Sequence, residues 1–343
     1  MVKLDIHQPL IAHLPQSAYL LSIIGDKPDE YDWVMNNFIN IMFNSKLGNE
    51  DFYRSDCWYN CYHITENAMT KSYIDGISNG NIVDFIINSI NNGYYVYTYA
   101  ITKYLPHQKN DSDIRHAPLF YGYDSTTKRF YIADSFCGNR FLLTDISYTQ
   151  ARSALSYDEF NNPKYYPYIL FRLIKKKEGY TYNFDYHDMY LKILDYMDSK
   201  CYFNNLYPPF DCNIYEDFLW EDIENPYDYS FGLNFYYAAI ESALDKKLRS
   251  RQLHLLYCHK AMMKARLVYL GKKYKLDSLD ELMENCDDIL RNTTIVRNRY
   301  YKDELKHVFD VNRIVSELYL LKKQDTAFTS KLLLALERTK IDV

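Results

Sequence analysis

The chain is short of glycine, of excess charge and of long apolar runs, and each shortage excludes a class of protein. Only 10 of its 343 residues are glycine, and it has no Gly-rich phosphate loop or dinucleotide-binding fingerprint. Its 40 basic and 45 acidic residues nearly balance, which gives no electrostatic reason to expect nucleic acid or an anionic membrane as a partner. No apolar run approaches the roughly 18 residues of a membrane span. Since it also has no apolar signal segment, we expect a soluble cytoplasmic protein.

The seven cysteines are scattered without the rhythm of a disulfide framework. Cys57 and Cys61 are the closest pair, and no second Cys/His pair follows at zinc-finger spacing. His254, Cys258 and His259 fall on one predicted helix, but without further ligands they indicate packing and surface positions. Reduced thiols and no metal or bound cofactor are therefore expected.

What the chain does have is aromatic and periodic sequence, with 37 Tyr and 18 Phe. Up to about residue 178, β-type segments such as Tyr94–Ile101 alternate with predicted helices such as Tyr31–Phe43. After that point, long stretches repeat apolar residues at helical spacing. The pattern predicts an α+β protein with a mixed domain over 1–178 and a helical domain over 179–343.

A predicted hairpin carries a histidine and an aspartate at its open end. If Tyr123 faces Arg129, then His116 faces Phe136, and His116 and Asp134 become diagonal neighbours on one sheet face, roughly 7–8 Å apart. A carboxylate bonded to one ring nitrogen orients an imidazole and leaves the other nitrogen as a base. The alternative is an isolated strand histidine beside an unrelated aspartate.

Two residues are candidates for the nucleophile that such a base would activate. Ser17 lies at the predicted start of the first helix, where backbone N–H groups favour a developing anion, although an N-cap role also explains it. Cys57 is the stronger nucleophile by chemistry, although a small buried side chain is its alternative role. Cys61 and Cys137 are weaker candidates for the same reason.

The segments NNGYYVYTYAITKYLP, HAPLFYGYD, RFYIADSF and GNRFLLTDIS, with the helix before them, lie between Ile82 and Ser147. This block resembles the family named for the N-terminal domain of butirosin biosynthesis protein H. The resemblance implies a papain-like cysteine-peptidase fold for the first domain and makes His116 and Asp134 members of a Cys-His-Asp site. Known members transfer acyl or aminoacyl groups from carrier-protein thioesters to amines during antibiotic assembly.

The chain departs from that family at the nucleophile. The first helix begins PQSAYLLSII and contains no cysteine, so the aligned position is Ser17, or else Gln16. Serine could replace cysteine, Cys57 could act from another loop, or the site could have lost its chemistry and kept a pocket.

The resemblance therefore implies two functions from different classes. The first is an acyl or aminoacyl transferase, or an enzyme forming or hydrolysing amide bonds, in nonribosomal peptide biosynthesis. Its partners are a carrier-protein thioester, which brings the phosphopantetheine, and an amine acceptor, with the helical domain completing the cleft. The second is a catalytically silent accessory protein that binds a peptide, a product or a carrier protein.

Overall fold

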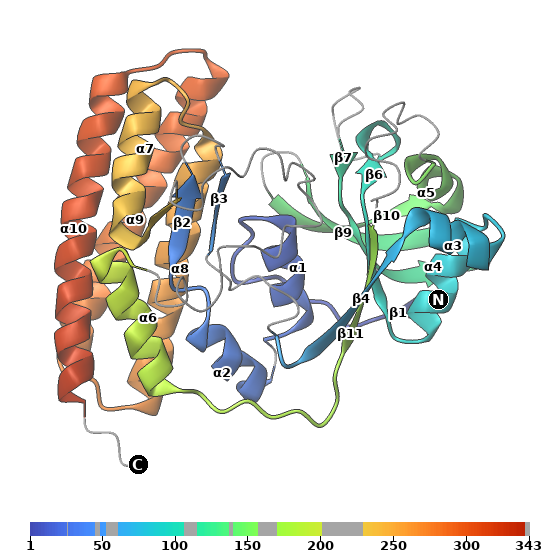
Figure 1. The fold of residues 1–343 in the computed structure, drawn as a ribbon, viewed down its shortest axis with the longest axis horizontal. Coiled ribbons are helices and arrows are strands. Elements are labelled where there is room, and N and C mark those ends of the chain that lie inside the picture. Colours follow the sequence, from blue (N-terminus) through green and yellow to red (C-terminus); the bar gives the residue numbers. More distant parts are fainter. Residues whose placement is uncertain are drawn as a thin grey trace. The chain divides into compact units, whose positions relative to one another are not determined.

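The computed structural model describes residues 1–25, 27–44, 49–52, 61–105, 115–136, 140–156, 170–200 and 229–339. These residues form two compact units. The described residues of 1–30 and 61–182 make up the first unit, and those of 31–52, 183–200 and 229–339 make up the second. The chain is an α+β protein with antiparallel sheets and a C-terminal helical region (Figure 1).

The first unit is built on one antiparallel sheet with the strand order β10-β9-β8-β5-β11-β4. A further short strand, β1, pairs with β8 beside β5. The strands are β1 (Val2–Lys3), β4 (Ile64–Thr70), β5 (Tyr95–Tyr97), β8 (Leu119–Asp124), β9 (Arg129–Phe136), β10 (Arg140–Ser147) and β11 (Leu170–Lys176). Strands β6 (Ala100–Ile101) and β7 (Arg115–His116) form a separate pair.

Helices cover both faces of this sheet (Figure 1). On one face, α3 (Lys71–Ser78), α4 (Ile82–Asn91) and α5 (Tyr148–Ala154) bury a core that includes Val96 of β5. The next residue, Tyr97, points to the opposite face because strand side chains alternate. There it packs against Tyr19 of α1 (Pro15–Ile23), with ring centroids 5.5 Å apart.

The β8–β9 hairpin differs from the predicted register at its turn and agrees with it at its open end. The residue opposite Arg129 is Asp124, whereas the predicted register placed Tyr123 there. The turn is tighter than predicted because the Asp124 carboxylate accepts a hydrogen bond from the N–H of Thr126. An irregularity at Tyr121 then shifts the register by one residue. The two offsets cancel, so that Leu119 lies opposite Ala133, as the predicted register requires.

His116 does not extend strand β8, contrary to the prediction of one continuous strand. It lies in β7, where it pairs with Ala100 of β6. Pro118 separates β7 from β8, and proline has no backbone N–H to donate to a ladder. The histidine is thus held by a second, short ribbon at the end of the main sheet.

The second unit is mainly helical. A three-stranded sheet, β12-β2-β3, joins β2 (Ile41–Asn44), β3 (Asn49–Phe52) and β12 (Tyr229–Phe231). A short 3-10 turn, η8 (Gly232–Asn234), follows β12. The α-helices are α6 (Tyr186–Asp198), α7 (Phe235–Leu244), α8 (Ser250–Lys273), α9 (Leu279–Leu305) and α10 (Val311–Arg338). Helices α8, α9 and α10 bury a continuous apolar core with α6.

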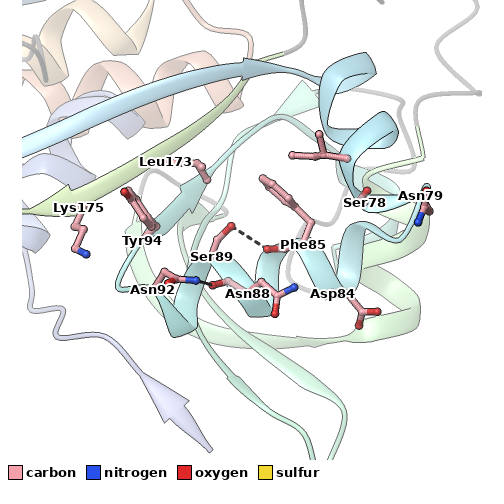
Figure 2. A pocket seen from close by; sticks show the side chains of 11 residues that line it. Ser78, Asn79, Asp84, Phe85, Asn88, Ser89, Asn92, Tyr94, Leu173 and Lys175 are labelled. Atoms are coloured by element: carbon pink, nitrogen blue, oxygen red, sulfur yellow. Dashed lines mark hydrogen bonds between the residues drawn. The ribbon is translucent and has the colours of Figure 1, made fainter.

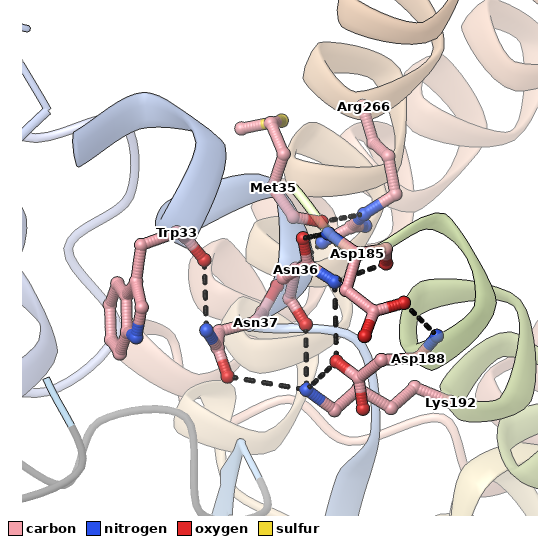
Figure 3. Close-up of polar contacts among 8 residues, drawn as sticks. All are labelled: Trp33, Met35, Asn36, Asn37, Asp185, Asp188, Lys192 and Arg266. Carbon is pink, nitrogen blue, oxygen red and sulfur yellow. Dashed lines mark hydrogen bonds and ion pairs between the residues drawn. The ribbon is translucent and has the colours of Figure 1, made fainter. Parts of the chain in front are cut away.

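A buried arginine holds the end of α2 (Pro28–Asn36) in this unit, as Figure 3 shows. Arg266 of α8 donates to the carbonyls of Met35 at 2.8 Å and Asn37 at 2.6 Å. Burial lowers the pKa of Arg266 to about 9, since no carboxylate is among its bonded partners. The carbonyls at a helix C-terminus carry partial negative charge and so suit a buried cation.

Two predictions about residues 31–56 differ from the structure. The sequence predicts one helix over Tyr31–Phe43, whereas α2 ends at Asn36 and β2 begins at Ile41. Phe38 between them has a φ of 55°, which breaks the helix. The described residues of 31–52 also belong to the second unit, because β2 pairs with β12, a strand almost two hundred residues further along the chain. No helix among the described residues is long and apolar enough to cross a membrane.

Candidate active site

The predicted histidine and aspartate lie together in the first unit. The Nδ1 atom of His116 is 2.6 Å from the Oδ2 atom of Asp134. The Asp134 side chain is fully buried, while the His116 side chain is 25% exposed. The ring is therefore the part of the pair that a substrate can reach.

This geometry determines the tautomer of the imidazole. An ionised carboxylate has no hydrogen to donate, so the bond to Asp134 requires the proton of a neutral ring to be on Nδ1. The lone pair is then on Nε2, which is the arrangement of a general base. The chemistry expected from the hairpin is thus available at His116.

A tyrosine that the sequence did not indicate also contacts Asp134. The Tyr19 hydroxyl lies 2.6 Å from the Ala117 carbonyl and 3.1 Å from Oδ1 of Asp134. In the sequence Tyr19 is one of several apolar residues in SAYLLSII, and its helical spacing marks only a core position. The polar tip of tyrosine was the one available signal, and 37 tyrosines share it.

Ser17 is placed differently from the sequence expectation. The helix begins at Pro15, so Ser17 is its third residue and not its N-cap. Its hydroxyl accepts from the Leu14 N–H at 3.3 Å and donates to the Leu14 carbonyl at 3.1 Å. The side chain is fully buried. No hydrogen bond joins it to His116 among the described residues.

Helical geometry explains this separation. Residues two apart on an α-helix point about 200° from each other. Because Tyr19 faces Asp134, Ser17 points to the far side of α1. Gln16, three residues before Tyr19, shares the Tyr19 face and is 8% exposed. The side of α1 that meets the pair therefore presents the carboxamide of Gln16.

The cysteine candidates divide into two groups. Cys57 and Cys137 lie outside the described residues. Cys61 is 2% exposed, and burial raises the pKa of its thiol to about 12. A thiol with such a pKa is protonated at neutral pH and is a poor nucleophile.

The other predicted polar positions do not form a metal site. His254 Nε2 and Cys258 Sγ are 3.8 Å apart, and His259 instead bonds the Ile39 carbonyl. No cluster of metal-binding side chains is present in the described part of the chain. His63 is buried, and burial lowers its pKa, so that it is neutral at pH 7.

A separate groove of about 560 Å³ opens between α3, α4 and β11 (Figure 2). Its apolar lining comes from Ile77, Phe85, Tyr94 and Leu173. Amide side chains such as Asn88 and Asn92 lie beside them. Neither His116 nor Asp134 lines it. The groove and the candidate base are thus different features of the same unit.

No protein-family model matches the chain, and no curated protein is significantly similar to it.

Proposed function

We propose that the protein transfers an acyl or aminoacyl group from a carrier-protein thioester to an amine, in nonribosomal peptide or antibiotic biosynthesis. The observation that carries the proposal is the 2.6 Å contact between a partly exposed His116 and a fully buried Asp134. The block of residues 82–147 that resembles the butirosin-type family supports the choice of substrate. A helix packed on one face of an antiparallel sheet also supports a papain-like fold for the first unit.

In the proposed reaction, Nε2 of His116 removes a proton from the nucleophile as it attacks the thioester carbonyl. The tetrahedral intermediate then collapses, the C–S bond breaks, and the leaving thiolate takes the proton from the imidazolium. Asp134 orients the ring and stabilises its charged form. When the nucleophile is a protein side chain, these steps leave the acyl group on that side chain. The acceptor amine then attacks the acyl carbonyl, His116 takes the amine proton, and the side chain leaves with that proton. Water in place of the amine hydrolyses the thioester.

Three groups are candidates for the attack on the thioester carbonyl. Ser17 would have to leave both of its bonds to Leu14 and turn about the axis of α1 to reach His116. Cys57, outside the described residues, remains the second candidate for a covalent intermediate. The acceptor amine itself can also attack directly, with His116 as its base.

A second function has its own supporting observation. The hydroxyl of Ser17 is fully buried and bonded at Leu14, as expected for a structural serine. A family member that has lost its nucleophile could serve as an accessory protein that binds a peptide or a carrier protein. In that case the His116–Asp134 pair would be a polar contact within a binding site.

Thiol release from an aminoacyl N-acetylcysteamine thioester, with a small primary amine as acceptor, tests the transferase. We expect His116→Gln to lower kcat/KM by about 100-fold or more, because a general base is lost. His187→Gln is the matched control, since His187 is exposed and lies in the second unit. Equal rates in these two variants would rule out His116 as the base.

Mass spectrometry of the protein after reaction with the same thioester identifies the attacking group. An acyl adduct that disappears in Cys57→Ala assigns the nucleophile to Cys57, and one that disappears in Ser17→Ala assigns it to Ser17. Turnover without an adduct indicates direct attack by the amine. No turnover, combined with binding of a phosphopantetheinylated carrier protein, would favour the accessory protein.

A further inference from the structure

We propose that Tyr19 is a positioning residue for His116, acting through Asp134 and through the backbone of Ala117. The inference rests on the proposed role of His116 as a base. Its physical basis is a chain of three contacts, from the Tyr19 hydroxyl to Asp134 and Ala117 and from Asp134 to the imidazole.

The phenol of Tyr19 touches both groups that determine where the ring of His116 points. Ala117 directly follows His116, so a bond to its carbonyl fixes the backbone beside the histidine. Asp134 Oδ2 contacts the ring, and Tyr19 contacts the other oxygen of the same carboxylate. One phenolic proton is shared between these two acceptors, and the shorter contact is with the carbonyl.

The surroundings of Tyr19 make its hydroxyl important and its ring replaceable by phenylalanine. Tyr19 and Asp134 are both fully buried, and Ala117 is 4% exposed. Water therefore has little access to replace a lost donor. The Tyr19 ring packs against Tyr97 and Phe141, with centroids 5.5 Å and 6.3 Å away. Tyr19→Phe would keep these ring contacts and remove only the hydroxyl.

Tyr19 also links two parts of the chain that the sequence separates by almost a hundred residues. It projects from α1, whereas Ala117 and Asp134 lie next to β8 and within β9. The contact therefore fixes the rotation of α1 about its own axis relative to the base. It places Gln16 on the side of the pair and Ser17 on the opposite side.

The test compares Tyr19→Phe with Tyr95→Phe, a matched control. Tyr95 is also a buried tyrosine of the first unit, and its hydroxyl donates to the backbone carbonyl of Asp5. Both variants remove one buried phenolic hydroxyl that donates to a backbone carbonyl, so both should lower the midpoint of urea unfolding. Only Tyr19→Phe should change His116.

The readout is the tautomer of His116, measured by ¹H–¹⁵N correlation of the imidazole rings at a pH well above the ordinary histidine pKa. The His116→Gln spectrum assigns the signal. In the parent protein we expect the proton on Nδ1. In Tyr19→Phe we expect the tautomer ratio to change by about five-fold, the effect of one lost hydrogen bond. Tyr95→Phe should leave the ratio unchanged.

An unchanged tautomer ratio in Tyr19→Phe, with the same loss of stability as Tyr95→Phe, would overturn the inference and leave Tyr19 a packing residue. This measurement uses no substrate. Its outcome is therefore separate from that of the thioester assay, in which failure of His116→Gln to slow turnover would overturn the proposed function alone.

Discussion

At the residue scale, the second unit contains a buried ion pair that resembles part of an active site, but its contacts are those of a structural ion pair. Lys260 of α8 and Asp325 of α10 are each 1% exposed and form an ion pair. Tyr196 and Tyr236 donate their hydroxyls to the same carboxylate, at 2.5 Å and 3.1 Å. Burial raises the pKa of both phenols well above 10, so they stay protonated and can donate. Every charge in this cluster is thus compensated within it.

Removing one partner of that pair should be strongly destabilising. Asp325→Asn leaves the Lys260 ammonium buried without a counter-charge, and we expect it to lower the free energy of unfolding by about 3 to 5 kcal/mol. The control is Glu281→Gln, which breaks the half-exposed Lys331–Glu281 pair between α9 and α10. That change should cost under about 1 kcal/mol. Urea unfolding measures both, and equal losses would contradict the prediction.

At the element scale, tight approaches of the backbone determine where helices and strands can begin. Gly232 follows β12 with a φ of 54°, and a Cβ atom there would lie 2.1 Å from the Tyr196 carbonyl oxygen at the end of α6. Only glycine fits between these two elements. The periodic pattern of the sequence predicts the helix that follows Gly232, but it does not indicate this contact.

Gly232→Ala should therefore lower the free energy of unfolding by more than the cost of placing alanine in a left-handed backbone conformation. We expect a loss of about 3 to 5 kcal/mol, from backbone strain combined with displacement of the Tyr196 carbonyl. Gly179→Ala is the control, since Gly179 has a φ of 73° and nothing within 4 Å of its added Cβ. It should lose only about 1 to 2 kcal/mol. If chemical denaturation gives the two variants the same stability, the close approach at Gly232 is not as described.

At the scale of the whole molecule, each unit contains a buried neutral histidine. His63 belongs to the first unit and His259 to the second, and burial lowers the pKa of both below 6.5. Nε2 of His259 contacts the Ile39 carbonyl at 2.7 Å, so its proton is on that nitrogen. Its Nδ1 is buried without a partner in the described structure. Protonating His259 would place a charge in a dry interior. Protonating His63 would place a charge at a buried position that Asp29, 3.9 Å away, compensates only in part.

The free energy of unfolding should consequently decrease as the pH is lowered below about 6.5. In that range the unfolded histidines bind protons and the folded ones do not, so unfolding takes up protons. Each histidine adds up to about 1.4 kcal/mol per pH unit to the slope. The raised pKa of buried Glu50 acts in the opposite sense, at and above its ordinary value of 4.5.

Urea midpoints measured between about pH 7.5 and about pH 5.5 test this pH dependence. His63→Gln and His259→Gln should each flatten it. His187→Gln removes an exposed histidine and should leave the slope unchanged. A parent protein equally stable across this range would contradict the assignment of neutral buried rings.

Local pattern was sufficient for several features of the fold and the candidate site. Helical spacing in the second half predicted the long helices. The hairpin pattern predicted that His116 and Asp134 lie close together, although His116 is in β7 rather than in a continuation of β8 and the predicted turn was off by one residue. These features depend on neighbours within a few turns or across one short loop, and so they are visible in the sequence itself.

The sequence by itself determined the α+β class, the helical C-terminal region and the residue types of the candidate base and its orienter. The tertiary structure decided that Tyr19 completes the pair, that Ser17 faces away from it, and that β2 joins the second unit. Each of these depends on how an element is rotated or which distant strand it meets. Contacts across a hundred residues or more set such choices, and spacing along one chain does not record them.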